Sequence, residues 1–305
     1  MNLRNHVRIG SRRSKLALAQ SRSVVAQLSR IHPDLKIELI EISTTGDRNW
    51  EIPLEKFGSE GIFIKELEEA LLAEKIDLAV HSLKDMPVLI PAELRLAAVT
   101  ERADPRDVLI SRSGKLAELP KGARIGTGSP RRAIQLLEQR PDLQIGGLRG
   151  NIETRLKRVS PDGFDGIVMA AAALIRLGLE GRITEYLPSE TFIPAVGQGA
   201  LGIEIRASDT KIAELATSLN CEPAWQEVTA ERVFLKLLGG GCRAPIAALG
   251  RVKGGSLKLC GMVSDSKGTQ VLRAEAEGMA SEPDGIGDEL ARRLIDMGAG
   301  RLIGK

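Results

Sequence analysis

Hydrophobic positions along the chain follow two alternating periods. Short runs rich in β-branched residues are typical of strands, and stretches with an apolar residue every three to four positions are typical of amphipathic helices. The first pair is a strand at 7–9 and a helix over 15–30. Because strand and helix keep alternating, the pattern predicts an α/β fold. Further strands are expected at 36–42, 78–81, 94–99, 124–126, 166–169 and 201–205, and further helices at 62–73, 131–139, 152–159 and 211–219.

Two segments rich in proline, glycine and charge interrupt this order, at 101–106 and 188–199. Such segments are typical of connections between structural units. If both cross between domains, residues 101–194 form an inserted second α/β lobe. The strand at 201–205 then returns to the first lobe, which consists of 1–100 and 195–219.

Residues 220–305 have a different order of elements, because their strands follow one another without helices between them. This predicts a third, small α+β domain. Its expected elements are a helix over 224–238, strands at 246–252, 257–263 and 270–276, and a last helix over 287–297.

Composition excludes several classes of function. The formal net charge is only +3, from 43 basic against 40 acidic residues, and only 3% of residues are aromatic. Neither an overall basic surface nor a base-stacking platform for nucleic acid is therefore expected. Apolar runs of membrane-spanning length and a signal-peptide apolar stretch are absent from the sequence, which favours a cytoplasmic protein without a membrane partner. The spacing of the three cysteines predicts neither a disulfide framework nor a metal site.

Cys242 follows three consecutive glycines, 239–241, and precedes Arg243. Glycines permit backbone conformations that other residues rarely adopt and let a ligand come close. A neighbouring arginine favours the thiolate, which is the nucleophilic form of cysteine. From these residues alone, Cys242 is either a functional nucleophile or an ordinary member of a glycine-rich loop.

A faint internal repeat supports the two-lobe organisation, because residues 8–11 (Arg-Ile-Gly-Ser) are echoed at 124–127 (Arg-Ile-Gly-Thr). A helix follows each copy. After the second, Ser129 is a suitable N-cap with Pro130 at the first helical position. A helix start of this kind presents N–H groups to an anion. The alternative is an ordinary cap beside solvated arginines.

Further arginines follow strand ends, at Arg149, Arg155 and Arg176. The planar guanidinium suits carboxylates and phosphates, so the set predicts a polyanionic ligand. A charged, solvated face is the alternative. In open α/β sheets, however, ligands bind beyond the carboxyl ends of strands, where these arginines are expected.

An apolar strand also ends in Ser82, Leu83, Lys84 and Asp85, a segment with three polar side chains, before Met86 and Pro87. Asp85 is the best candidate for acid–base or charge-stabilising chemistry, with Ser82 and Lys84 as ligand contacts. A surface turn is the alternative. His81 is interpreted as a packed strand residue, and the three histidines of the chain do not suggest a Ser-His-Asp or Cys-His mechanism. The long connection 44–61 is expected to form a loop over the cleft.

Taken together, these motifs resemble the porphobilinogen deaminase (hydroxymethylbilane synthase) family over essentially the whole chain. The matching segments are 14–18, 80–87, 126–132, 148–155, 196–200 and 240–242. The resemblance implies a monomer of three domains, whose first two lobes, built on mixed sheets, look like periplasmic binding proteins. It also implies a dipyrromethane cofactor attached to Cys242 through a thioether. Such enzymes join four porphobilinogen molecules head to tail into hydroxymethylbilane and release ammonia each time.

The resemblance gives the polar residues their expected roles. Loss of ammonia from porphobilinogen leaves a cationic azafulvene, which the Asp85 carboxylate would stabilise. Every ring of the growing polypyrrole chain carries an acetate and a propionate. The residues expected to contact them are Arg12, Ser14, Ser82, Lys84, Thr127, Ser129, Arg131, Arg132, Arg149, Arg155 and Arg176, with Lys56 in the loop over the cleft. Many relatives carry a second lysine in that loop, whereas this chain has Glu60, so a paired-lysine role is not expected.

Two other functions remain open from the residues alone. A non-catalytic two-lobed receptor for a small anion would share the fold but needs neither the glycine-presented Cys242 nor a third domain. A thiol-dependent transferase would use Cys242 as an ordinary nucleophile, but the sequence suggests no base beside it.

Overall fold

The computed structural model describes residues 5–44, 64–239 and 245–304. It divides into two compact units, which are described separately. The first consists of Met1–Ala103 and Ala200–Trp225, and the second of Asp104–Gly199 and Gln226–Lys305. Lys56, Glu60 and Cys242 lie outside the described residues.

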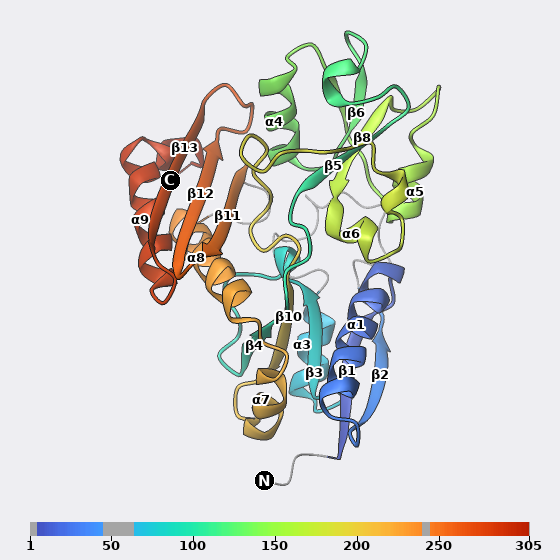
Figure 1. The fold of residues 1–305 in the computed structure, drawn as a ribbon, viewed down its shortest axis with the longest axis vertical. Helices are drawn as coiled ribbons and strands as arrows, with labels where there is room; N and C mark the ends of the chain where they lie inside the picture. The colour runs from blue at the N-terminus through green and yellow to red at the C-terminus, as the bar shows by residue number, and fades with distance from the viewer. Residues whose placement is uncertain (1–4, 45–63, 240–244, 305) are drawn as a thin grey trace. The chain divides into compact units, whose positions relative to one another are not determined.

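A mixed five-stranded sheet forms the centre of the first unit, in the order β2-β1-β3-β10-β4 (Figure 1). Strand β1 is parallel to β2 and β3, whereas β10 is antiparallel to β3 and β4. Apolar residues of α1 and α7 pack on one face and those of α3 on the other, so both faces are buried. The element bounds are β1 His6–Arg12, α1 Lys15–Ile31, β2 Lys36–Ile42, α3 Lys65–Leu72, β3 Leu78–Ser82, β4 Leu94–Val99, β10 Leu201–Arg206 and α7 Thr210–Thr217.

The inserted lobe of the second unit contains another mixed five-stranded sheet, in the order β7-β6-β8-β5-β9. Its core lies on both faces, with α4 on one side and α5 and α6 on the other. The element bounds are β5 Asp107–Ser111, β6 Arg124–Gly126, α4 Pro130–Gln139, β7 Gln144–Gly146, α5 Ile152–Lys157, β8 Gly166–Ala170, α6 Ala171–Ile175 and β9 Glu185–Tyr186.

The two sheets repeat one topology. Strand β6 is parallel to β7 and β8, and β5 is antiparallel to β8 and β9, as in the first sheet. The repeat extends to individual hydrogen bonds. The backbone N–H of Arg8 donates to the Asp77 carboxylate at 2.8 Å, and the backbone N–H of Arg124 donates to the Asp165 carboxylate at 2.8 Å. Both arginines belong to the repeated Arg-Ile-Gly sequence, so the structure confirms the repeat.

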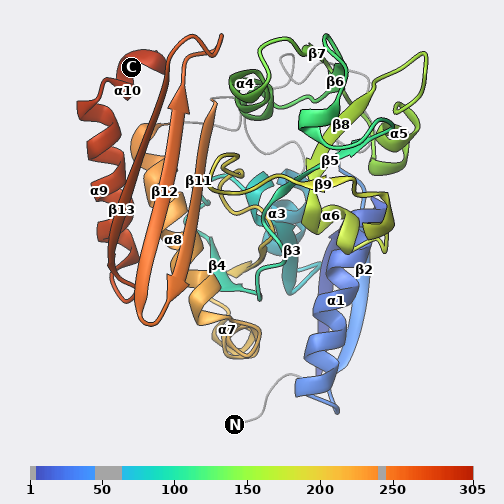
Figure 2. The ribbon, with the colours of Figure 1, turned by 45° about the horizontal axis from the view of Figure 1, so that its top comes forward.

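The C-terminal region is α+β, as expected. It contains α8 (Glu222–Leu238), the antiparallel sheet β11 (Ile246–Lys253), β12 (Ser256–Ser264) and β13 (Val271–Met279), then α9 (Pro283–Asp296) and α10 (Ala299–Leu302). Apolar residues of α8 and α9 share one core with this sheet (Figure 2). On its other face, Leu249 and Met262 pack against Ile193 of the inserted lobe. Among the described residues no helix combines the length and hydropathy needed to span a membrane.

Candidate active site

The turn after β3 carries three of the predicted site residues. Leu83–Asp85 forms a single 3-10 turn after Ser82. The Gln20 side chain of α1 donates to Ser82 Oγ at 2.7 Å, and the backbone N–H of Leu83 donates to the carbonyl of Ala200 at 3.1 Å. Because Leu83 is also buried, the turn is anchored from three sides.

The polar side chains of this turn are more exposed to solvent than the buried Leu83 that anchors it. Asp85 is exposed and Lys84 is half-buried, as is Arg12 at the end of β1. Ser14 caps α1 and accepts a hydrogen bond from the N–H of Ala17 at 3.3 Å. Since β1 and β3 are parallel neighbours, the residues that follow them meet at one edge of the sheet.

In the inserted lobe, α4 begins as the sequence predicts, with Ser129 at the N-cap and Pro130 in the first turn. The Ser129 hydroxyl makes no capping bond. Its backbone N–H donates to Thr127 Oγ1 at 3.2 Å. Gly128 lies between them, and a Cβ there would lie 2.8 Å from the carbonyl oxygen of Leu148, so only glycine fits this contact.

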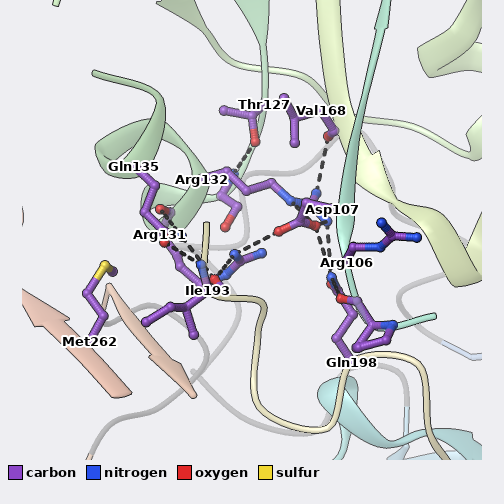
Figure 3. Close-up of polar contacts among 12 residues, drawn as sticks. Arg106, Asp107, Thr127, Arg131, Arg132, Gln135, Val168, Ile193, Gln198 and Met262 are labelled. Atoms are coloured by element: carbon purple, nitrogen blue, oxygen red, sulfur yellow. Dashed lines mark hydrogen bonds and ion pairs between the residues drawn. The ribbon is translucent and has the colours of Figure 1, made fainter. Parts of the chain in front are cut away.

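Arg131 and Arg132 are buried at the start of α4 and converge on Asp107 (Figure 3). Arg132 donates to Asp107 Oδ1 through Nε at 3.0 Å and Nη2 at 2.6 Å, and to the carbonyl of Val168 at 3.3 Å. Arg131 Nη1 donates to the carbonyl of Ile193 at 2.7 Å and lies 2.8 Å from Asp107 Oδ2. One carboxylate therefore holds two guanidiniums.

Two glutamines complete this cluster. Gln198 Nε2 donates to Asp107 Oδ1 at 3.0 Å and to the carbonyl of Pro105 at 2.7 Å. Gln135 binds both backbone groups of Ile193, accepting from the N–H at 2.7 Å and donating to the carbonyl at 3.0 Å. The sequence predicts no role for Asp107 or either glutamine, although Gln198 lies in the matching segment 196–200.

Burial and charge pairing in this cluster shift the pKa values of Asp107 and Arg131 from their ordinary values. Burial alone would raise the pKa of Asp107, but the guanidiniums of Arg131 and Arg132 outweigh it and hold the pKa below its ordinary value. Burial lowers the pKa of Arg131 despite Asp107. Burial also lowers the pKa of Arg176, to about 10, and its Nη2 donates to the carbonyl of Gly199 at 2.7 Å.

Two more predicted arginines lie beyond β7. Arg149 is exposed, and Arg155 is half-buried in α5, where its Nε donates to the carbonyl of Gly150 at 2.7 Å. Asn151 caps this helix by accepting from the N–H of Thr154 at 2.8 Å.

Each lobe thus gathers its predicted residues at or just beyond the carboxyl edge of its parallel strands. Arg12, Ser14, Ser82, Lys84 and Asp85 belong to the first lobe, and Thr127, Ser129, Arg131, Arg132, Arg149, Arg155 and Arg176 to the inserted lobe. The inserted lobe buries more positive than negative charge, which suits a ligand with several carboxylates. Within the residues that the structure describes, no group of three or more His, Cys, Asp or Glu side chains could hold a metal ion.

Comparisons with known proteins cover nearly the whole chain. Residues 7–214 match the family model for the dipyrromethane cofactor binding domain of porphobilinogen deaminase, and residues 225–296 match its C-terminal domain. The porphobilinogen deaminase of Syntrophobacter fumaroxidans is 45% identical over 298 residues, covering 97% of this chain and 96% of that protein. That of Desulforudis audaxviator is 47% identical over 304 residues, covering 99% and 98%.

The chain belongs to the porphobilinogen deaminase family. Members of this family are hydroxymethylbilane synthases, and this enzyme condenses four porphobilinogen molecules head to tail into hydroxymethylbilane, releasing ammonia, on a dipyrromethane cofactor. Periplasmic binding proteins are among the solved structures similar to it. One is the periplasmic aliphatic sulphonate binding protein SsuA from Escherichia coli, with 15% identity and a TM-score of 0.41 over 76% of this chain and 70% of that one.

Proposed function

We propose that Cys242 holds the dipyrromethane through a thioether, that Asp85 is the catalytic carboxylate, and that the arginines at the carboxyl edges of both sheets bind the pyrrole carboxylates. The observation that carries the proposal is the buried excess of positive charge in the inserted lobe. Arg131, Arg132 and Arg176 are all largely buried, and Asp107 is the one acidic side chain bonded to them in the described part of the chain.

The cofactor fits the residues present. A dipyrromethane carries four carboxylates, and buried cations are stable only when paired with anions. When bound, the dipyrromethane supplies the free pyrrole α-carbon to which the first substrate is joined. Side chains of the inserted lobe hold carboxylates without taking part in bond formation, because guanidiniums neither give up nor accept protons at neutral pH.

Asp85 acts on the substrate. Positive charge develops on the pyrrole as ammonia leaves, and a carboxylate near the ring N–H stabilises that charge most when its own position is already fixed. The anchored turn supplies this fixed position through Ser82 and Leu83. Lys84 and Arg12, at the same sheet edge, bind the carboxylates of the reacting ring.

The chemistry of Cys260 supports the choice of Cys242. Burial and the neighbouring Glu275 raise the pKa of Cys260 to about 12, so its thiol stays protonated at neutral pH and is a poor nucleophile. We also propose a cytoplasmic monomer of three domains, with porphobilinogen and the growing chain as partners and with neither nucleic acid nor membrane.

The intact mass of the purified protein tests the attachment. The unmodified enzyme should be heavier than its sequence mass by two pyrrole units, and Cys242→Ala should be folded, inactive and of sequence mass. A dipyrrole retained by this variant, or found on Cys221 or Cys260, would show that the assignment is wrong. Cys260→Ala is the matched control and should keep the added mass.

A further inference from the structure

An ion pair joins the last turn of α4 to the C-terminal sheet. Arg273 of β13 donates to Glu138 of α4 through both terminal nitrogens, from Nη1 to Oε1 at 2.8 Å and from Nη2 to Oε2 at 2.6 Å. Two parallel hydrogen bonds of this kind fix the relative orientation of the side chains as well as their distance. The two residues belong to different domains, so the pair links the inserted lobe to the C-terminal domain.

The same β-hairpin also contacts the middle of α4. A Cβ on Gly268, in the turn between β12 and β13, would lie 3.0 Å from Ile134 Cγ1. The Asp265 carboxylate holds this turn by accepting from the N–H groups of Lys267 at 3.1 Å and Thr269 at 2.9 Å. Because Ile134 and Glu138 are four residues apart, the hairpin touches the helix at two points about one turn apart.

A third contact runs through Ile193 (Figure 3). Gln135 of α4 binds both backbone groups of Ile193, at 2.7 and 3.0 Å. The Ile193 side chain packs with Leu249 of β11 and Met262 of β12. Residues three and four positions apart share a helix face, so positions 134, 135 and 138 present one face of α4 to the C-terminal domain.

Both linked elements lead to the candidate active site. Cys242 belongs to the C-terminal domain, between α8 and β11 in the sequence. Helix α4 begins at the carboxyl edge of the inserted sheet, among the side chains proposed to bind pyrrole carboxylates. A pyrrole chain attached to the cysteine and bound through its carboxylates is then held by two domains. Its reactive end keeps a constant position only if those domains keep a constant distance.

We propose that Arg273 is a positioning residue, which with Glu138 clamps the C-terminal sheet onto α4, so that the cofactor-bearing domain and the inserted lobe move as one body through all four additions. The apolar contacts bring the surfaces together without fixing their orientation, because hydrophobic contact is not directional. The paired hydrogen bonds supply the direction. The inference rests on the proposed attachment at Cys242 and on the carboxylate-binding role of the inserted lobe.

Reversal of the charges tests the proposal. Arg273→Glu and Glu138→Arg each place two like charges where the ion pair was, and the double variant restores a pair with the charges exchanged. Each single variant should fold, because the apolar contacts remain. Each should lower kcat about tenfold with little change in KM, since small misplacements of reacting groups are costly. The double variant should recover most of the lost kcat. Ammonia release at several porphobilinogen concentrations measures both constants.

The chain offers a matched control in Arg112→Glu. Arg112 Nη2 lies 2.9 Å from Asp165 Oδ1, and the exposed fractions of these side chains, 36% and 26%, are close to the 37% and 29% of Arg273 and Glu138. Both control residues belong to the inserted lobe, so this variant should keep its kcat. All proteins are assayed well below their unfolding midpoints, where a merely stabilising pair would leave kcat unchanged. Single variants as active as the control, or a double variant no faster than either single variant, would overturn the proposal.

A covalent link in place of the ion pair provides a second measurement. The protein carries Glu138→Cys and Arg273→Cys, and its other free thiols are removed by Cys221→Ser and Cys260→Ala. It should be slow until a short bismaleimide joins the two new thiols, and should then regain kcat. Cys242 does not compete for the reagent when it is held as a thioether. A link that slows the enzyme would show that the contact opens during the cycle, and a link without effect would show that the contact positions nothing; either result contradicts the proposal.

Intact mass separates the failure of this inference from the failure of the proposed attachment. The unmodified enzyme and all of these variants should carry two pyrrole units. An unmodified enzyme without the added mass would contradict the assignment of Cys242. Loaded variants that turn over at the unmodified rate would contradict the role of Arg273 and leave that assignment standing.

Discussion

His81 and Glu204 form a buried pair on neighbouring strands of the first sheet. His81 Nε2 lies 2.9 Å from Glu204 Oε2, and the exposed fractions of the two side chains are 3% and 0%. Within the described residues, Glu204 Oε1 has no hydrogen-bond partner. Since His81 directly precedes Ser82, the pair fixes the end of the strand that leads into the Asp85 turn. The histidine is therefore a packed strand residue, as the sequence suggests.

Glu204→Leu should lower the free energy of unfolding by about 1–3 kcal/mol, because it leaves the buried His81 ring without its acceptor. Urea unfolding gives the value. The chain offers an exposed control in His6 and Glu38, which lie 3.5 Å apart with about half of each side chain exposed. Glu38→Leu should change stability little, because exposed pairs contribute little. Equal losses in both variants would contradict the structural importance of the buried pair.

Cys260 should react slowly with iodoacetamide at pH 8, because burial and the hydrogen bond to Glu275 raise the pKa of its thiol to about 12. Alkylation follows the thiolate fraction, so its rate should keep rising with pH up to that value. Glu275→Gln should lower the pKa and speed the reaction. Lys258→Gln should slow it, since the lysine favours the thiolate. Peptide mass spectrometry measures both rates, and shifts in the same direction would refute this account.

Asp85→Asn should reduce kcat on the order of a hundredfold, since it keeps the shape of the side chain and removes the charge that stabilises the cationic substrate. Asp85 is exposed, so the variant should fold normally. Ammonia release under saturating porphobilinogen measures the effect. Turnover near the wild-type rate would make Asp85 a structural residue.

Arg149→Leu and Arg155→Leu should slow later additions more than the first, because each added ring brings two further carboxylates to be bound. Anion-exchange chromatography after limited substrate addition separates enzyme species by charge and should show intermediates accumulating. Arg158→Leu is the matched control, since Arg158 is exposed at the end of the same helix. A distribution like that of the control in both variants would mean that Arg149 and Arg155 only solvate the surface.

Much of the fold follows from local pattern. Strands at 36–42, 94–99 and 124–126 have the bounds that the sequence predicts, and α1 ends one residue later than predicted. Five of the described strands and helices have no predicted bounds, namely β5, β7, β9, α6 and α10. Strand β5 directly follows the proline-containing connection 101–106. Strands β7 and β9 are too short to show an alternation of apolar and polar residues. Helix α6 starts directly from β8 without a capping side chain, so no start signal marks it.

The sequence predicts a set of site residues but not the network of contacts that some of them form. Arginines that follow strand ends can be recognised in sequence, because parallel strands deliver them to one edge. Their partners cannot, because Asp107 and Gln198 approach Arg132 from positions far away in the chain. The spacing of apolar residues along a chain does not indicate which buried carboxylate will form an ion pair with which guanidinium. Residues 45–63 and 240–244, which include Lys56 and Cys242, lie outside the described part of the structure, so their roles remain predictions.

Gly128 has a consequence for how this enzyme could evolve. A side chain at this position would have to displace the Leu148 carbonyl, and the next residue is Arg149. The backbone segment that leads to Arg131 and the segment that carries Arg149 therefore cannot move independently of each other. A relative that accepted a substrate with more widely spaced acidic groups could not obtain the new spacing by changing one of these segments alone. Selection for altered substrates should instead act on side-chain length at positions 149 and 155, because such changes leave the backbone contact in place.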